Sequence, residues 1–159
     1  MTRPGDRQLS HHDGFTLIEL LLVIVIVAVT ANIALPRWAA SVQNYQLKMA
    51  GHQVIADLAL AQSRANYSSA AVTVAFNTSA GTYQVLGMTD PNRGTGTYTV
   101  NLAAAPYRIA MASASFNGAT QITFDAYGTP TQGGTIVLAS GNRQLSIVVD
   151  ATSGKAVVQ

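Results

Sequence analysis

The chain contains no cysteine and few charged residues of either sign. Charged residues make up 10% of the 159 positions, and the formal net charge is +2. Without cysteine there is no disulfide framework, no zinc–thiolate site and no thiol nucleophile. Soluble domains usually contain about 25% charged residues, so the shortage argues against a disordered chain, a coiled coil or a highly charged soluble enzyme. Hydrophobic residues, by contrast, make up 48%, and their distribution indicates the class of protein.

The longest hydrophobic run extends from residue 15 to residue 35. As a helix it is roughly 32 Å long, which is enough to cross the core of a bilayer. Many of its residues are β-branched and favour strand in water, but in lipid a helix satisfies all its backbone hydrogen bonds internally. The alternative is a buried helix of a soluble domain, which is disfavoured because no other segment has enough apolar surface to surround it. The sequence therefore predicts a membrane span.

The start of this run carries a candidate processing and assembly site. Residues 1–14 are polar and end in Gly14, Phe15 follows, and an isolated acid, Glu19, lies inside the run. A carboxylate in lipid costs several kcal/mol, so it is a functional candidate by default. If the chain is cut after Gly14, the new amine of Phe15 lies one helical turn from Glu19, and the two charges can pair within a chain or between subunits. Alternatively, Glu19 simply reaches the headgroup level, and the spacing alone does not decide between these interpretations.

This junction resembles a known motif. The segment Gly14-Phe15-Thr16-Leu17-Ile18-Glu19-Leu20 is similar to the prepilin peptidase motif of type IV pilins and type II secretion pseudopilins. The resemblance implies that the peptidase cuts between Gly14 and Phe15 and methylates the new Phe15 amine. It also implies that Glu19 pairs with the amine terminus of a neighbouring subunit during assembly. Pro36 stands where many such pilins have a proline that bends or locally unwinds the long helix, and it is the second expected assembly residue.

The spacing of apolar residues after Pro36 predicts that the helix continues to about Tyr67 as an amphipathic segment. One apolar row consists of Trp38, Val42, Tyr45, Met49, His52, Ala56 and Ala59. A second row beside it consists of Leu47, Gly51, Val54, Leu58, Ala61 and Ala65. Together the two rows are wider than a coiled-coil seam and are typical of a helix packed on a sheet. The charged Lys48, Asp57 and Arg64 are expected elsewhere on the helix surface.

From residue 70 onward the hydrophobic pattern alternates with a period of two, which predicts short strands. The expected strands are residues 71–77, 82–86, 97–103, 107–112, 121–128, 134–140, 143–150 and 155–159. Gly141-Asn142 is a two-residue hairpin turn between two of them. The predicted fold is α+β and pilin-like, with a long N-terminal helix packed on a mostly antiparallel β-sheet head. The expected divisions are a leader at 1–14, a transmembrane and assembly helix at 15–36, an amphipathic half at 37–68 and the head at 69–159.

Motifs in the C-terminal third of the chain indicate a particular group of pilin-like proteins. The chain resembles the GspH/FimT-type minor pilins and pseudopilins in Phe124-Asp-Ala-Tyr-Gly128, Gly134-Thr-Ile-Val-Leu, Arg143-Gln-Leu-Ser-Ile-Val-Val and Gly154-Lys-Ala-Val. The resemblance implies a structural subunit of a type II secretion pseudopilus or a type IV pilus. It also implies a single-pass inner-membrane protein with a periplasmic head. The implied partners are other pilin or pseudopilin subunits, prepilin peptidase and an inner-membrane assembly platform.

DNA uptake is the alternative function. Some members of the family end in a glycine followed by two arginines that bracket an apolar residue, a pattern linked to DNA binding. Here Gly154-Lys155-Ala156-Val157 keeps only one of the two cations. The candidate DNA-binding residues are Arg143, Lys155 and Arg108, because Arg143 and Lys155 are expected on or beside adjacent strands and DNA binding requires several cations on one face. The other interpretation is a thinly charged, solvated surface.

Catalytic and metal-binding patterns are not found in the sequence, so we expect a protein that is not an enzyme and has no metal or cofactor. The segment from Asp90 to Gly94 superficially resembles a calcium loop. However, Gly94 occupies the third ligand place, and Asn101 stands where the bidentate acid of such a loop should be. We therefore expect an ordinary turn there.

Overall fold

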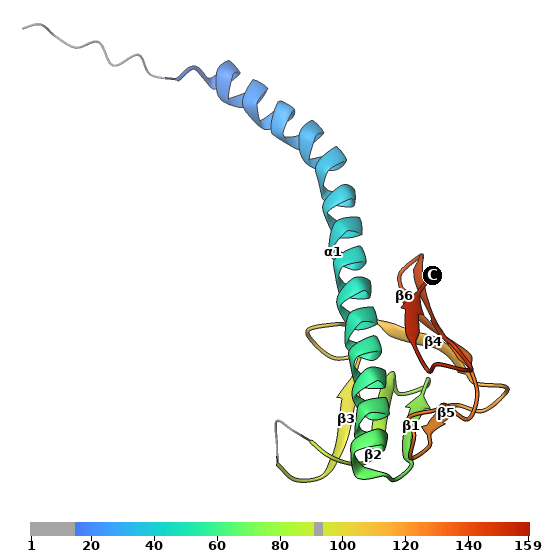
Figure 1. Cartoon of the computed structure of the whole chain (residues 1–159). Helices are drawn as coiled ribbons and strands as arrows, with labels where there is room; N and C mark the ends of the chain where they lie inside the picture. Colours follow the sequence, from blue (N-terminus) through green and yellow to red (C-terminus); the bar gives the residue numbers. More distant parts are fainter. Residues whose placement is uncertain (1–14, 91–93) are drawn as a thin grey trace, which may run out of the picture. The chain divides into compact units, whose positions relative to one another are not determined.

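The computed structural model describes residues 15–90 and 94–159, with side chains throughout except at positions 35 and 36 (Figure 1). The predicted leader, including Gly14, lies outside the described residues. The chain divides into two compact units, residues 1–39 and 40–159. A single helix, α1 (Leu17–Ser68), begins in the first unit and ends in the second. Its range includes Pro36, so the helix does not end at this proline.

Local signals explain where α1 begins and ends. At the start, the backbone N–H of Glu19 donates to Oγ1 of Thr16 at 3.3 Å, as in the T-x-x-E capping box. The acidic side chain in the first turn is also favourable next to the positive end of the helix dipole. At the other end, Ser69 adopts a φ of 48°, and the N–H of Ala70 donates to the carbonyl of Ala65. Both ends lie within about two residues of the predicted ones.

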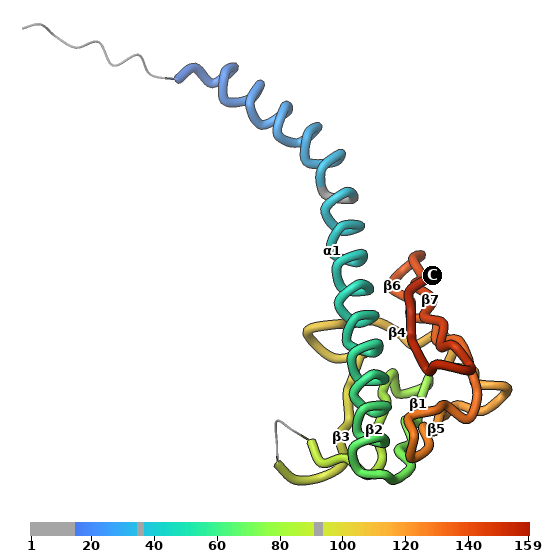
Figure 2. The backbone as a smooth tube through the Cα atoms, in the orientation of Figure 1, coloured from blue at the N-terminus to red at the C-terminus, as the bar shows by residue number. Residues whose placement is uncertain are grey.

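The strands of the described head form two antiparallel sheets rather than one. Figure 2 traces the path of the backbone through them. The first sheet has the order β3-β2-β1-β5 and consists of β1 (Val72–Asn77), β2 (Thr82–Thr89), β3 (Thr97–Asn101) and β5 (Gln121–Phe124). The second has the order β4-β6-β7-β8 and consists of β4 (Ala110–Ser115), β6 (Gly134–Ser140), β7 (Arg143–Val149) and β8 (Ala156–Val158). The α+β class and the antiparallel pairing predicted from the sequence are confirmed.

The strand predicted at residues 107–112 is displaced, because β4 occupies Ala110–Ser115. Arg108 has a φ of 53°, a left-handed conformation that a non-glycine residue does not adopt in a strand. The N–H of Ile109 donates to the carbonyl of Leu102 at 2.9 Å, which closes a turn just before the strand. Alternation of apolar residues in the sequence did not reveal this turn.

The core lies between the sheets and one side of α1. The buried helix row consists of Leu47, Ala50, Gly51, Val54, Leu58, Ala61 and Ala65. Gly51 lets the helix approach β7 closely, since a Cβ there would lie 2.6 Å from Cδ2 of Leu145. The other predicted row is largely outside, with Trp38 71% and Tyr45 67% exposed. The predicted stripe was therefore too wide, because the sheets cover only one side of the helix.

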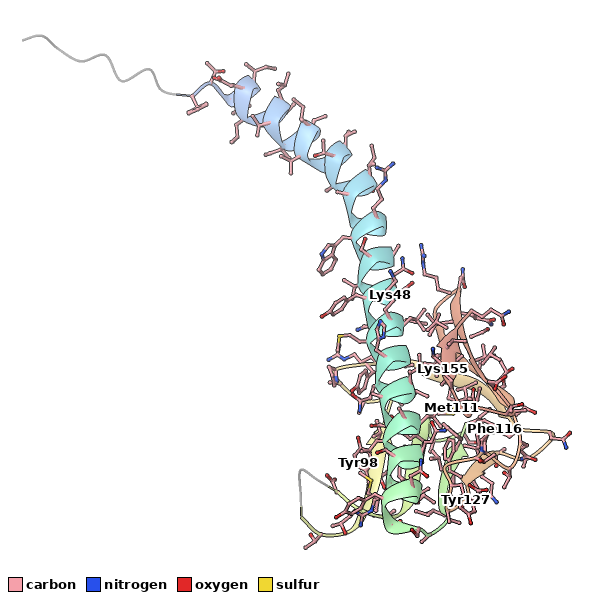
Figure 3. The ribbon with its side chains drawn as sticks, viewed as in Figure 1. Lys48, Tyr98, Met111, Phe116, Tyr127 and Lys155 are labelled. Atoms are coloured by element: carbon pink, nitrogen blue, oxygen red, sulfur yellow. The ribbon has the colours of Figure 1, made fainter. Side chains whose placement is uncertain are left out.

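Aromatic packing joins the two sheets. The rings of Phe76 on β1 and Phe116, which follows β4, are stacked with their centroids 5.5 Å apart. Phe76 also contacts Tyr83 on β2 at a centroid distance of 5.6 Å. Phe116 is completely buried, and Figure 3 shows it within the head. Large aromatic side chains of this kind provide most of the apolar area that a small core buries.

Candidate assembly site

The predicted processing site lies at the beginning of the described chain. Phe15 precedes α1, and its side chain is 84% exposed. Glu19 is exposed in the first turn of the helix, four residues further on. In the uncut chain the Phe15 nitrogen is an amide and carries no charge, so a Phe15–Glu19 ion pair requires cleavage first. The proposed pairing of this amine with Glu19 therefore stays a prediction.

The apolar run of α1 is exposed on all sides. The large apolar side chains between Phe15 and Ile33 are 47% to 84% exposed, and the most hydrophobic window has no buried part. Two of its polar side chains bond to the helix backbone: Oγ1 of Thr30 donates to the carbonyl of Ile26, and Nδ2 of Asn32 donates to that of Ala28. These bonds replace those to water, so the segment suits a lipid environment. Its length and composition are sufficient to cross a membrane.

The candidate DNA-binding residues Arg143 and Lys155 lie at opposite ends of β7. Nη1 of Arg143, at the start of the strand, donates to Oδ1 of Asn44 on α1 at 2.7 Å. Lys155 lies opposite Asp150, just after the strand, and accepts the Asp150 N–H with its carbonyl at 3.0 Å. Seven residues of extended chain correspond to roughly 23 Å. The structure thus separates the pair that the sequence placed on adjacent strands.

The third candidate, Arg108, belongs to the same end of the second sheet as Arg143. The register aligns Ala110 on β4 with Ala139 on β6, and Ala139 in turn with Gln144 on β7. Arg108 precedes Ala110 by two residues, and Arg143 precedes Gln144 by one. Strand pairing therefore brings Arg108 and Arg143 to one end of the second sheet and leaves Lys155 at the other.

Asp57 is a residue that sequence reasoning misplaced. It was expected on the surface but is only 4% exposed. Its carboxylate accepts hydrogen bonds from the hydroxyl of Tyr83 on β2, from the hydroxyl of Tyr98 on β3 and from Nε2 of Gln53 one turn earlier on α1. A buried charge is tolerated when it is fully hydrogen-bonded, and these three donors meet that need. The residue therefore ties the helix to two strands of the first sheet.

The tyrosines around this carboxylate are held in their neutral form. Burial, together with the negative charge of Asp57, raises the pKa of Tyr98 to about 12 and that of Tyr83 above its usual range. The pKa of Tyr107 is raised by the same two causes, and its hydroxyl donates to Oε1 of Gln53 at 3.3 Å. A signal for this cluster was present in the sequence, because Asp57 lies three residues after Val54 in the buried row.

Gln62 connects the two glycine turns that carry the family resemblance. Its Nε2 donates to the carbonyl of Gly128 at 2.8 Å and to that of Ser153 at 2.7 Å. These turns follow β5 and β7, so one side chain of α1 holds a loop of each sheet. Gly154, next to Ser153, is buried against the same side chain. The two motif glycines therefore belong to one packing site on the helix.

Within residues 15–90 and 94–159, no group of three or more His, Cys, Asp or Glu side chains is placed to hold a metal ion. Of the segment from Asp90 to Gly94, where the sequence predicts a turn, residues 91–93 lie outside the described part of the chain. The carbonyl of Asp90 accepts the N–H of Gly94 at 2.8 Å. What the described chain offers is an exposed apolar helix joined to a packed head, an arrangement suited to assembly.

Comparison with known proteins gives the family. A family model described as Type II transport protein GspH matches residues 50–153, and the prokaryotic N-terminal methylation motif matches residues 9–31. The crystal structure of the type IV minor pilin FimU from Pseudomonas aeruginosa is similar in fold, with a TM-score of 0.51 and 16% identity over 73% of this chain and 88% of that chain. Among curated proteins no sequence matches significantly. Because the GspH model covers more than half of the sequence, the chain belongs to the GspH family of minor pilins and pseudopilins, which are structural subunits and not enzymes.

Proposed function

We propose that this chain is a minor pseudopilin or minor pilin, a structural subunit of a type II secretion pseudopilus or a type IV pilus. The observation that carries the proposal is the match to the methylation motif at residues 9–31, a range that includes Phe15, Glu19 and the start of an exposed apolar helix. In the proposed sequence of events, prepilin peptidase removes residues 1–14 and methylates Phe15. The mature subunit then enters the filament through its helix.

The exposed helix is suited both to the membrane and to a filament, and Glu19 supplies the preference for assembly. In the membrane its apolar surface is covered by lipid, and in a filament it is covered by the helices of other subunits. Glu19 is costly in either apolar setting unless a cation neutralises it. The amine at the start of a neighbouring helix is such a cation, so pairing with Glu19 favours one register between subunits. In this proposal, Pro36 bends or locally unwinds the helix where it leaves the membrane.

The proposed location is the bacterial inner membrane, with a single span and the head in the periplasm. The apolar helix and the family indicate membrane anchoring. The proposed partners are other pilin or pseudopilin subunits, prepilin peptidase and the assembly platform in that membrane. Mass spectrometry of the protein from cells with and without prepilin peptidase tests the first step. We expect a mature chain that begins at methylated Phe15, and a Gly14→Val variant that stays uncut.

The role of Glu19 is tested by a neutral replacement of similar shape. A Glu19→Gln variant should be cut and methylated normally, but we expect its crosslinking to other filament subunits to fall at least about tenfold, as loss of about 1.4 kcal/mol implies. Thr30→Val is the matched control, since it removes a polar group from the same helix without removing a charge. Normal crosslinking of Glu19→Gln would contradict the pairing role. The same crosslinking is then compared between a strain that lacks the type II secretion machine and a strain that lacks the type IV pilus machine. The strain in which the crosslinks are lost identifies the machine to which the subunit belongs.

A further inference from the structure

Positive and negative side chains of the head lie at different levels along the axis of α1. No acid lies between Glu19 and Asp57 in the sequence, so this stretch of the helix carries only cations. Lys48 is exposed on it, and Arg143, also exposed, is bonded to Asn44 one turn earlier. The β6–β7 hairpin that carries Arg143 contains no acid either. The end of the head where α1 enters it is therefore cationic.

The acids of the head are buried or lie at the other end. Asp57 and Asp90 are only 4% and 8% exposed. Asp125 and Asp150 reach the surface in the two turns whose carbonyls bind Gln62. Hydrogen bonds from the backbone and side chain of Ser153 keep the pKa of Asp150 below its usual value, so this acid is charged at neutral pH.

The two ends are well separated. Asn44 and Gln62 are eighteen residues apart on α1, which corresponds to roughly 27 Å. Figure 3 shows the same order, with Lys48 on the segment of α1 that enters the head and Lys155 beside a later segment. Lys155 adds a cation to the end that contains Asp125 and Asp150, and it lies opposite Asp150. The head thus has a cationic end and an end of mixed charge.

The cationic end follows the apolar run closely in the sequence. Asn44 is nine positions after Leu35, so the chain between them spans at most about 32 Å when extended and about 14 Å as a helix. The headgroup layer extends roughly 5–8 Å beyond the hydrocarbon core. Electrostatic attraction reaches a further 8 Å or so at physiological ionic strength. With the helix in a membrane, Asn44 and the Arg143 bonded to it are therefore within reach of lipid phosphates. Lys48 lies one turn further on, roughly 20 Å from Leu35 as a helix, and extends its long side chain toward them.

We propose that the end of the head carrying Lys48 and Arg143, with Arg108 at the same end of the second sheet, binds anionic phospholipid headgroups of the membrane that holds α1. This inference rests on the membrane anchoring in the proposed function. Two or three cations suffice because the anchor keeps the local concentration of lipid high. Arg143 has five N–H donors, so its bond to Asn44 leaves donors for a phosphate. Before assembly, the head then rests against the bilayer surface.

The absence of native cysteine makes a direct distance test simple. Asn142→Cys places a single thiol in the exposed β6–β7 turn, and Thr152→Cys places one in the β7–β8 turn at the other end of β7. The full chain, labelled with a fluorophore, is inserted into vesicles that contain a headgroup-attached quencher. Vesicles of phosphatidylcholine alone are compared with vesicles that also contain phosphatidylglycerol. We expect anionic lipid to increase quenching at position 142 and to leave position 152 unchanged.

Charge variants identify the residues that carry the effect. Lys48→Gln and Arg143→Gln should each lower the ratio of lipid-bound to free heads by about fivefold in anionic vesicles. Arg143→Lys should retain most of the response, because it keeps the charge even though it alters the bond to Asn44. Lys155→Gln is the matched control, since it removes an equal charge from the other end and should have no effect. Salt should weaken the quenching at position 142.

Three outcomes would overturn the inference. Equal quenching at position 142 in neutral and anionic vesicles would exclude a role for lipid charge. An equal loss of quenching in Lys155→Gln would show a response to overall charge and not to this end of the head. Quenching that follows protein density and not lipid composition would indicate contact with another subunit. If the unmodified chain does not float with vesicles at all, the membrane anchoring in the proposed function fails as well, which separates the two failures.

Discussion

Gly154 lies so close to Gln62 that a Cβ atom at position 154 would be 2.9 Å from Nε2 of that side chain. The same Cβ would lie 2.9 Å from Cε1 of Phe124, and Gly154 has a φ of +71°. Glycine is required here both by space and by backbone conformation. Since Gln62 also binds the Gly128 carbonyl, this contact fastens the β7–β8 turn and the turn after β5 to the helix. The glycine of the family motif therefore has a packing role.

Replacing Gly154 should cost more stability than replacing a glycine that is constrained by its backbone alone. Gly154→Ala adds overpacking to left-handed strain, so we expect a loss of about 2–4 kcal/mol in the free energy of unfolding. Gly118→Ala is the control, because Gly118 has a φ of +89° with nothing within 4 Å of an added Cβ. It should lose about 1–2 kcal/mol. Urea unfolding of the full chain in detergent measures both, and equal losses would contradict the packing role.

Neutralising Asp57 should loosen the helix from the first sheet. Asp57→Asn replaces an acceptor of three hydrogen bonds, and we expect it to lower the free energy of unfolding by about 1.5–3 kcal/mol. Ser63→Ala, at an exposed position on the same helix, should change it by less than about 0.5 kcal/mol. Thermal unfolding followed by near-ultraviolet circular dichroism compares the two. A fully stable Asp57→Asn protein would show that the carboxylate is dispensable.

The head should lose stability in alkali as its buried tyrosines ionise. The pKa of Tyr98 is about 12 in the folded protein, against the ordinary tyrosine value of 10.0. Between these values the unfolded chain gives up the proton and the folded chain keeps it, so the stabilisation is complete below pH 10 and is lost as the pH rises to about 12. Tyrosinate absorbance and circular dichroism, recorded against pH, should therefore change together. In Tyr98→Phe the loss between pH 10 and 12 should be smaller, and an unchanged profile would exclude this contribution.

DNA binding by the head should be weak. Arg143 and Lys155 lie roughly 23 Å apart along the second sheet, so they do not form one compact cationic face. We expect the full chain in detergent to produce no gel shift of double-stranded DNA at 150 mM salt. A shift that persists at this salt concentration and is lost in Lys155→Ala would instead support the DNA-uptake alternative. Arg143→Ala, tested in parallel, separates the contributions of the two ends.

The agreement between sequence and structure depends on how local each signal is. The period-two pattern located most strands, and Gly141-Asn142 correctly predicted the β6–β7 hairpin, because alternation and turn chemistry act over a few residues. The turn at Arg108, which displaces the predicted strand, was not predicted because the hydrogen bond that closes it joins Ile109 to Leu102 across a loop. The burial of Asp57 was not predicted because a charged residue is expected on the surface by default. Its burial depends on hydrogen bonds from tyrosine hydroxyls of β2 and β3, which are distant in the sequence.

By itself the sequence determined the apolar helix, the motif around Phe15 and Glu19 and the series of short strands, since composition and periodicity along the chain are enough for these. Tertiary structure alone decided which side of α1 is buried, how the strands divide into two sheets and which cations share an end of the head. Those features depend on strand register and on side chains that meet across distant parts of the chain, and no local pattern encodes them.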